Sequence, residues 1–330
     1  MFLWCMLLGG ASVSTHVVIN RAARHLGANA VLARTIRAAA AGATVHETDS
    51  LADIDAAARA IADAHGTTVV LCGGDGSYMA GVTALVRAFG ENELPQIALG
   101  PGGTVSTVAR NLGMGGSLET YAKRIVRAAI ENDGDVVVHP TLHVTDDEGG
   151  DRVGFIFGAG LVAQFFDVYD SSSEQGYFSA AKIVARIFGG SFVGGALAKK
   201  ILTPVPCTLT VDGKKAHADA YSLIVSSVVK DLGLHMHVTY RAAEDPKRVH
   251  LVASALGPLF LGPQLPFVVA GKRLRGKNHV DVLAECFQVG FEQPSGYVLD
   301  GDVLRARWVE VSAGPLLRTI RLRRVVLRDT

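Results

Sequence analysis

Residues 67–77 read TTVVLCGGDGS, and this stretch decides the fold of the first part of the chain. Thr67 to Cys72 is β-branched and uncharged, which is typical of a central parallel strand buried on both faces. The turn Gly73-Gly74-Asp75-Gly76-Ser77 follows at once, and glycines at a strand-to-helix turn let backbone N–H groups approach a phosphate chain. An Asp suits such a site only if a cation shares it, and Mg²⁺ would supply that cation. The stretch therefore predicts a phosphate site at the end of a buried strand.

The rest of the first 140 residues repeats the plan of strand, turn and helix. Val17 to Asn20 reads as a strand, and Arg24 to Ala40 carries apolar residues near helical spacing. Gln96 to Leu99 reads as another buried strand, a glycine turn occupies 100–104, and Val105 to Leu112 reads as a helix. This alternation predicts a parallel sheet wrapped by helices.

After Pro140 the pattern changes to short strands joined by tight turns. Leu142 to Thr145 and Arg152 to Phe157 flank the turn DDEGG at 146–150, which indicates an antiparallel hairpin. A second hairpin is expected to turn at Asp212-Gly213 and to return along Ala218 to Ser226. Other expected elements are strands at His235–Thr239, His279–Ala284 and Trp308–Val311 and a helix at Tyr177–Phe188. A domain boundary near residue 140 and a mainly β second domain follow.

Charge and cysteine content exclude several classes of protein. Lys and Arg number 32 against 31 Asp and Glu, a net charge of +1, so we expect no nucleic-acid partner. The four cysteines lie far apart without a C-x-x-C pair, which fits neither a zinc site nor a disulfide framework and favours the cytoplasm. Met1 to Leu8 is apolar but lacks the charged start of a signal peptide, so an unstructured or mis-started leader is favoured over a cleaved signal.

The glycine turn does not match two common nucleotide-binding fingerprints. Met79 stands where the dinucleotide fingerprint needs its third glycine. The Gly-Lys pairs that begin at 213, 271 and 276 are never followed by Ser or Thr, so the chain has no Walker A loop. Taken alone, the turn is explained equally well as a tight connection between a strand and a helix.

Four stretches of the chain share an order and a spacing with one known family. Residues 17–21 read VVINR, 70–77 read VLCGGDGS, 101–110 read PGGTVSTVAR and 299–302 read LDGD. They resemble, in order, the v-x-N-P, GGDGT, P-x-G-T-x-N-D-x-A-R and D-G-E motifs of the diacylglycerol kinase catalytic-domain superfamily, which includes sphingosine, ceramide and bacterial lipid kinases. The resemblance covers the chain from about Val17 to the C-terminus, and four ordered motifs are far more specific than one.

The chain also departs from these motifs at several positions, and these departures bear on the function as much as the matches do. Ser77 replaces Thr and keeps the hydroxyl, and Arg21 replaces the usual Pro. Ser106 and Thr107 replace Asn and Asp, which removes a carboxylate that the family places near the nucleotide. Where many bacterial members have a glycine-rich segment and a metal-holding Asp-Gly, this chain reads KDLG at 230–233 and EDP at 244–246, so the resemblance gives no basis for an auxiliary metal site. The N-x-G-x-L-G-F element of NAD kinases is missing from the sequence, which argues against that branch.

The resemblance implies a fold and a set of site residues. The fold is a three-layer α/β/α nucleotide-binding domain of residues 16–140, to which the segment 313–330 returns, and a mainly antiparallel β-sandwich domain of residues 141–312 for the lipid. Asp300 would accept the proton of the acceptor hydroxyl, with Asp302 as a helper or metal contact and Asp75 as a third catalytic residue. The nucleotide would lie on Asn20, Gly73, Gly74, Asp75, Gly76, Ser77, Gly103 and Thr104.

The implied reaction is the ATP-dependent, Mg²⁺-requiring phosphorylation of a lipid hydroxyl, with diacylglycerol as the leading acceptor and phosphatidic acid as the product. A sphingoid-base or other long-chain alcohol kinase is the alternative among enzymes. Ser106-Thr107 keeps open a non-catalytic nucleotide- or lipid-binding protein with the same fold. The sequence also leaves a homodimer open.

Apolar and basic segments of the second domain indicate transient contact with a membrane. Leu251 to Gly271 has no charged residue, but three prolines interrupt it, so we expect a buried helix followed by a loop and no membrane span. Lys199-Lys200 and the run KRLRGK at 272–277 are basic clusters that suit anionic headgroups. We therefore expect a cytoplasmic, peripherally membrane-associated protein.

His235 and His237 are spaced as a pair of metal ligands on one strand would be. His235 and His237 would lie on one face of the expected strand, but the sequence pattern supplies no third ligand. A role other than metal binding is therefore favoured for this pair.

Overall fold

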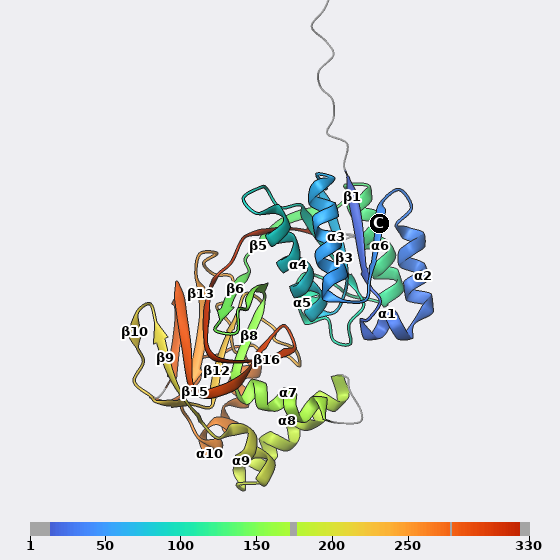
Figure 1. The fold of residues 1–330 in the computed structure, drawn as a ribbon. Coiled ribbons are helices and arrows are strands. Elements are labelled where there is room, and N and C mark those ends of the chain that lie inside the picture. The colour runs from blue at the N-terminus through green and yellow to red at the C-terminus, as the bar shows by residue number, and fades with distance from the viewer. Residues whose placement is uncertain (1–13, 172–176, 278, 324–330) are drawn as a thin grey trace, which may run out of the picture.

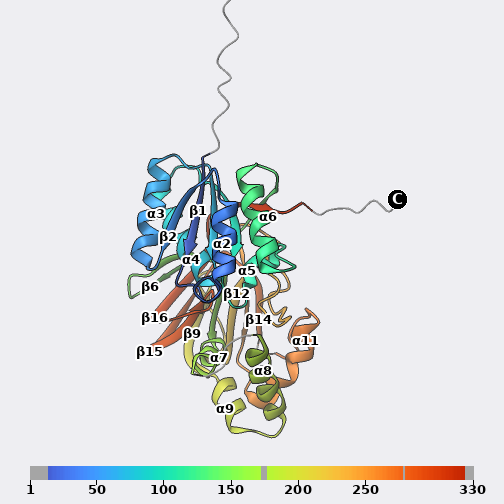
Figure 2. The same ribbon diagram turned by 90° about the vertical axis from the view of Figure 1, so that its right-hand side faces the viewer.

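The computed structural model describes residues 14–171, 177–277 and 279–323, and it contains two sheets with helices packed on them (Figures 1 and 2). The leader expected at Met1–Leu8 lies outside the described residues, as does the end of the returning segment, 324–330.

The first sheet is built from the first 140 residues and one strand near the C-terminus. Its order is β2-β1-β3-β4-β17-β5; β17 pairs in parallel with β4 and antiparallel with β5, and the other pairs are parallel. A late segment of the chain therefore completes the first sheet. Its strands are β1 (Thr15–Asn20), β2 (Thr44–Thr48), β3 (Thr68–Gly73), β4 (Gln96–Pro101), β5 (Asp135–His139) and β17 (Leu317–Arg321).

Helices cover both faces of this sheet, which gives three layers. The helices are α1 (Arg24–Ala28), α2 (Ala30–Ala39), α3 (Leu51–Asp63), α4 (Asp75–Phe89), α5 (Thr107–Asn111) and α6 (Leu118–Ile130). Leu32 of α2 and Ile125 of α6 pack in one core cluster, and Ile61 of α3 and Leu85 of α4 pack in another. Full burial of a side chain of this size contributes about 1.5–3 kcal/mol, so these apolar stripes hold the layers together.

Local sequence signals explain where two of these helices begin. The Ser50 hydroxyl accepts a hydrogen bond from the Asp53 N–H while the Asp53 carboxylate accepts one from the Ser50 N–H, so α3 starts with a capping box. The single helix expected over Arg24–Ala40 is wrong. The chain breaks at Asn29, whose side-chain oxygen accepts from the N–H groups of Val31 and Leu32 and so starts α2 as a new helix.

The second domain is mostly antiparallel, and within the described residues its paired strands form one sheet of eleven strands. The main path is β14-β13-β12-β8-β15-β16-β6-β7, and β9 joins it through β15. The strands are β6 (Leu142–Asp146), β7 (Asp151–Gly154), β8 (Ile156–Gly160), β9 (Val205–Val211), β10 (Lys214–Lys215), β11 (Ala220–Tyr221), β12 (Leu223–Ser227), β13 (Val249–Ser254), β14 (His279–Ala284), β15 (Cys286–Leu299) and β16 (Asp302–Ala313). The mixed fold class predicted from the sequence, a parallel-sheet α/β domain followed by a mostly antiparallel one, is confirmed.

A group of short helices lies at the end of the molecule away from α2 and α6 (Figures 1 and 2). These helices are α7 (Leu161–Asp170), α8 (Tyr177–Phe192), α9 (Ala196–Leu202), α10 (Pro258–Leu261), the 3-10 turn η1 (Gly262–Gln264) and α11 (Leu265–Val269). Of the helices found among the described residues, none is by itself long and apolar enough to cross a bilayer. The pair 178–192 and 196–202 meets the length and composition requirements only together, and it is bent by 100°.

Two expectations for the second domain are wrong, and a third is confirmed only in part. Leu251 begins no helix, because Val249–Ser254 is a strand buried between β12 and β14; a short apolar run does not distinguish a buried helix from a buried strand. The expected strand at His235–Thr239 is a series of turns. The hairpin at Asp212-Gly213 exists, and both Lys214–Lys215 and Ala220–Tyr221 return along β9. The return expected over Ala218–Ser226 ends there, because β12 pairs with β8 and β13 instead.

Two polar links connect the domains near the first sheet's carboxyl edge. On α4, the Thr83 hydroxyl accepts from the N–H of Val153 in β7 at 2.9 Å and donates to its carbonyl at 3.2 Å. At the end of α5, the Asn111 amide donates to the Asp231 carbonyl at 2.7 Å and accepts from the Asp231 N–H at 3.1 Å. Both helices that follow the glycine turns are thus tied to the second domain.

Candidate active site

The site lies at the carboxyl ends of β1, β3 and β4, where the two glycine turns pack against each other. A methyl group on Gly74 would lie 2.9 Å from the Gly103 Cα, and one on Gly103 would lie 2.3 Å from the Gly74 Cα. A methyl group on Gly102 would lie 2.8 Å from the Gly73 Cα. These glycines are therefore required first by backbone-to-backbone packing between the turns, before any phosphate is considered. The sequence suggested that phosphate binding requires these glycines, whereas packing between the turns already explains them.

A polar cluster fixes the start of α4 next to these turns. The Asn20 side-chain amide, at the end of β1, donates to the Ser77 hydroxyl oxygen at 2.8 Å. The Gly74 N–H also donates to this oxygen, at 3.3 Å. Ser77 therefore does the positioning that a Thr hydroxyl would do in the family motif. Helix geometry leaves the N–H groups of the first turn of α4 without partners within the helix, and they suit an anion.

Asp75 holds the second glycine turn in place. Its two carboxylate oxygens accept hydrogen bonds from the backbone N–H groups of Thr107 (2.8 Å) and Val108 (3.0 Å), at the start of α5. Desolvation raises the pKa of Asp75, although these N–H groups and the charge of Arg110 act in the opposite direction. The hydrogen bonds give Asp75 a positioning role between α4 and α5.

The two residues that depart from the family motif lie at the start of α5. Ser106 is buried and has φ 51°, ψ 52°, a left-handed conformation that Asn adopts more readily than Ser. Thr107 is also buried, and a methyl group on Gly233 of the second domain would lie 3.4 Å from its hydroxyl oxygen. This chain thus has a hydroxyl facing the second domain where the family has a carboxylate.

The turn between β15 and β16 brings two carboxylates to the glycine turns. Asp300 (φ 50°) and Gly301 (φ 93°) form the two-residue loop between the paired residues Leu299 and Asp302. Two positive φ angles are the requirement of a type I′ hairpin turn, for which Asp-Gly is a preferred sequence. The turn therefore explains Asp300-Gly301 by itself, but it does not require an acidic residue at 302.

Asp300 is buried, and both of its carboxylate oxygens are occupied. They accept from the N–H groups of Phe155 and Ile156, each at 2.9 Å. Burial raises the pKa of Asp300 well above its usual value and the negative charge of Asp75 raises it further, while the two N–H groups act against this shift.

Asp302 is exposed and reaches over the start of α4. A methyl group on Gly76 would lie 2.8 Å from one Asp302 carboxylate oxygen and 3.0 Å from the other. Desolvation by the surrounding protein raises the pKa of Asp302, and the nearby positive charge of Arg152 partly offsets this. The glycine turn at the start of α4 and a carboxylate from the opposite domain therefore lie next to each other.

One cavity of about 670 Å³ connects these groups to an apolar chamber in the second domain. Its polar end is lined by Asn20, Gly74, Asp75, Gly76, Ser77, Gly103, Thr104, Asp300 and Asp302. Its other end is lined by apolar side chains of α7, α8, α9 and the segment 232–238, among them Leu161, Phe165, Ile187, Ile201, Leu232 and Met236. Of the residues named from the sequence, Gly73 is buried beneath the turn and does not line the cavity.

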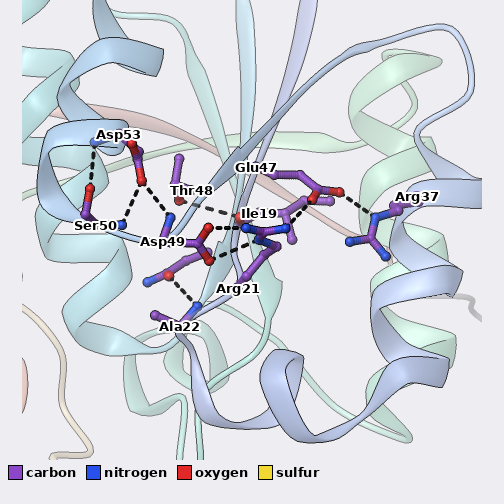
Figure 3. Close-up of polar contacts among 10 residues, drawn as sticks. Ile19, Arg21, Ala22, Arg37, Glu47, Thr48, Asp49, Ser50 and Asp53 are labelled. Carbon is purple, nitrogen blue, oxygen red and sulfur yellow. Dashed lines mark hydrogen bonds and ion pairs between the residues drawn. The ribbon is translucent and has the colours of Figure 1, made fainter.

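Arg21, at the position of the family's proline, takes part in a separate ion-pair cluster (Figure 3). Its guanidinium donates to both carboxylate oxygens of Asp49 and lies 3.4 Å from Glu47, which in turn pairs with Arg37 at 2.5 Å. These side chains are exposed or partly exposed, so the cluster adds little stability. Arg21 thus joins the ends of β1 and β2 and is not directed at the glycine turns.

Comparisons with known proteins bear on the family and the fold of the chain. Residues 14–137 match the family model of the diacylglycerol kinase catalytic domain. This part of the chain is therefore similar to a diacylglycerol kinase catalytic domain. No curated protein matches the sequence. The matched domain and the domain that follows it share their fold with solved structures from Bacillus anthracis str. Sterne, described as a diacylglycerol kinase or a candidate one.

Three of these structures have TM-scores of 0.61, 0.65 and 0.64 at 15%, 15% and 16% identity. Each alignment covers 94% of this chain and 97% of the other. At this identity the likeness concerns the fold alone. The family of the catalytic domain implies a kinase that uses ATP, while the acceptor is not given by these comparisons.

Two groups of residues around the site were missed by sequence reasoning. Asn111, which joins α5 to Asp231, is an isolated amide with no local pattern that would single it out. The helices α7 and α9, which line the apolar chamber, carry a signal in their apolar spacing, but it was overlooked because the region around them reads as β.

Proposed function

We propose that this protein transfers the γ-phosphate of ATP to the hydroxyl group of a membrane lipid, with diacylglycerol as the first acceptor to test. One observation carries the proposal: the same cavity contains the glycine turns, the carboxylate of Asp302 and a chamber lined by apolar side chains. A hydrophilic acceptor would not need such a chamber. Its volume lies within the range of about 300–1,000 Å³ that is typical of small-molecule sites.

At the polar end, this chain's own groups suit a phosphate tail. Asp75, Gly76 and Ser77 of the first turn of α4 line the cavity, and the partial positive charge of the helix start favours an anion. Asn20 and Ser77 fix that turn, and Asp75 fixes the neighbouring one. Phosphoryl transfer depends mainly on positioning and charge stabilisation, which rigid turns of this kind supply.

Asp302 is the better candidate for the general base. In the proposed reaction the lipid hydroxyl oxygen bonds to the γ-phosphorus, the bond from that phosphorus to the bridging oxygen breaks, ADP leaves and the hydroxyl proton passes to a carboxylate. Asp302 is exposed to the cavity, whereas each oxygen of Asp300 already accepts a backbone N–H. We therefore exchange the roles suggested by the sequence: Asp302 accepts the proton and Asp300 shapes the turn that presents it.

The carboxylates around the turns suit a divalent cation such as Mg²⁺. The pKa values of Asp75, Asp300 and Asp302 are all raised, and the charge of Asp75 contributes to the shift at Asp300. Mg²⁺ typically binds one or two carboxylates together with substrate phosphates, and Asp75 lines the cavity beside the glycine turns. When bound there, the ion would neutralise phosphate charge.

The apolar chamber also supports transient contact with a membrane. Short helices that line the cavity carry exposed apolar residues beside the lining ones: Leu259 and Phe260 are 55% and 67% exposed, whereas their neighbour Leu261 lines the chamber. The exposed basic residues Lys199 and Lys200 lie on α9, a helix that also lines the chamber. We propose that this end of the molecule rests on an anionic bilayer and receives the acceptor from it.

Transfer of radiolabelled phosphate from ATP to a lipid extract tests the proposal. Wild type and Asp302→Glu, which restores the residue of the family motif, should label a lipid. Asp302→Asn should reduce the rate about 100-fold or more, since it cannot accept the proton. A labelled sphingoid base would replace diacylglycerol as the acceptor. Calorimetry that shows ATP binding by a wild-type protein that labels no lipid would favour the non-catalytic alternative.

A further inference from the structure

A second cluster of ligand-type side chains lies outside the phosphate site, in the loop that follows β12. Among the described residues, Asp231, His235 and His237 are the group that brings three potential metal-ligand atoms within 4.8 Å of one another. One Asp231 carboxylate oxygen lies 3.5 Å from the His235 Nδ1 and 3.9 Å from the His237 Nε2. Two ligands bound at 2.1 Å to a tetrahedral ion are about 3.4 Å apart, so small side-chain rotations would bring these atoms onto one ion.

The hydrogen bonds of His237 and Asp231 leave two acceptors facing each other. The Nδ1 of His237 lies 3.1 Å from the carbonyl oxygen of Val269 and must carry a proton to donate to it. In the neutral ring, Nε2 then presents a lone pair toward the carboxylate of Asp231. A lone pair and a carboxylate repel each other unless a proton or a metal ion lies between them. Donation from the far ring nitrogen to a carbonyl is also the usual support of a histidine that ligates a metal.

The backbone holds the three side chains on one side of the loop. The N–H of Met236 donates to the Gly233 carbonyl at 3.0 Å, which closes a turn with Leu234 (φ 54°) and His235 (φ 56°) at its centre. Left-handed conformations are unfavourable for Leu and His, so tertiary contacts must impose this turn. Asp231 is fixed as well, because its second carboxylate oxygen accepts from the Gly233 N–H at 2.9 Å and its backbone pairs with Asn111.

We propose that Asp231, His235 and His237 form a site for one divalent transition-metal ion, with Zn²⁺ as the expected occupant. Two imidazoles and a carboxylate suit Zn²⁺, Co²⁺ or Fe²⁺ better than Mg²⁺, which prefers oxygen ligands. His235 has a 73% exposed side chain, so an ion can enter from solvent and keep water as a further ligand. The third ligand that the sequence pattern lacked is Asp231, which the turn brings back to the two histidines.

The ion would fix one wall of the apolar chamber. Leu232, Leu234 and Met236, within the loop that the three ligands close, line the same cavity as the glycine turns. Asn111 connects the Asp231 backbone to α5, the helix that follows the second glycine turn. The metal site itself is independent of the proposed lipid kinase reaction, because it rests on separate residues.

Metal binding to the full-length protein, freed of metal by a chelator and kept free of nucleotide, tests this inference. Zn²⁺ and Co²⁺ affinities are measured by competition with a chromophoric chelator, and Mg²⁺ is compared by calorimetry. We expect one Zn²⁺ per chain, and an affinity lower by about 100-fold or more in His235→Ala and in Asp231→Asn. His217→Ala, a histidine on another loop, is the matched control and should bind as wild type does. Visible absorption of the Co²⁺ form should disappear in the His235 variant.

Three outcomes would overturn the inference. The first is wild-type protein that binds neither Zn²⁺ nor Co²⁺ at micromolar concentrations, in which case a proton alone would separate His237 from Asp231. The second is Zn²⁺ affinity that is unchanged in both His235→Ala and His237→Ala. The third is a preference for Mg²⁺ over Zn²⁺ at this loop. Since His235 is exposed, its variant should fold, and thermal melting of the metal-free proteins verifies this.

Discussion

Replacing Gly76 with Ala should slow phosphoryl transfer without unfolding the protein. The new methyl group would lie 2.8 Å from an Asp302 carboxylate oxygen, whereas ordinary contacts begin at 3.4 Å. The carboxylate must therefore move by 3.4 − 2.8 = 0.6 Å. A misplacement of about 1 Å can reduce a rate about 100-fold, so a shift of this size should lower kcat about tenfold. Stability should change by less than about 1 kcal/mol, because a flexible side chain yields and Ala favours the helix.

Two further alanine variants make the comparison decisive. A methyl group on Gly103 would lie 2.3 Å from the Gly74 Cα, and backbone cannot yield as a side chain can, so Gly103→Ala should lower the melting temperature and abolish ATP binding. Gly115 has no atom within 4 Å of the added methyl group, and Gly115→Ala should behave as wild type does. The assays are radiolabel transfer, calorimetry with ATP and thermal melting. Wild-type kcat in Gly76→Ala, or loss of ATP binding there, would refute the assignment of Asp302.

Three other predictions test the interdomain link, the ionisation of Asp302 and the membrane surface. Asn111→Ala removes the hydrogen bonds between α5 and Asp231 and should lower the free energy of unfolding by about 1–3 kcal/mol, as measured by denaturant titration. Asn92→Ala, at an exposed asparagine, is the control and should leave this free energy unchanged. The base must be ionised, and desolvation by the surrounding protein raises the pKa of Asp302, so kcat/KM should fall on acidification at a higher pH than an ordinary Asp would give. Arg152→Gln removes an opposing charge and should move this fall to still higher pH; an unmoved profile would exclude Asp302 as the titrating group. The double variant Leu259→Ser, Phe260→Ser should bind anionic vesicles about tenfold more weakly or worse in a sedimentation assay. Val138→Ser, at a similarly exposed residue of the first domain, should bind the vesicles as wild type does.

Local sequence determined the elements whose signals lie within a few residues. Thr67 to Cys72 could be recognised as a buried strand because its residues are apolar or β-branched without a break, and the glycine turn and α4 follow directly from it. Asp300-Gly301 likewise gives its own turn, since both residues tolerate positive φ. The helix break at Asn29 and the strand at Val249–Ser254 were misread, because periodicity over short apolar runs does not separate the alternatives.

The tertiary structure decided which groups meet and what each can do. The sequence contains Asp75, Asp300 and Asp302 as three similar carboxylates, but only packing shows that backbone N–H groups occupy the first two and that the third faces the cavity. Asp231 and His237 become neighbours through a turn that Leu234 and His235 would not adopt on their own. Strands and turns follow from local chemistry. Whether a carboxylate is free to react depends instead on hydrogen bonds from residues far away in the sequence, such as the bond from the Phe155 N–H to Asp300, and only the folded chain brings such residues together.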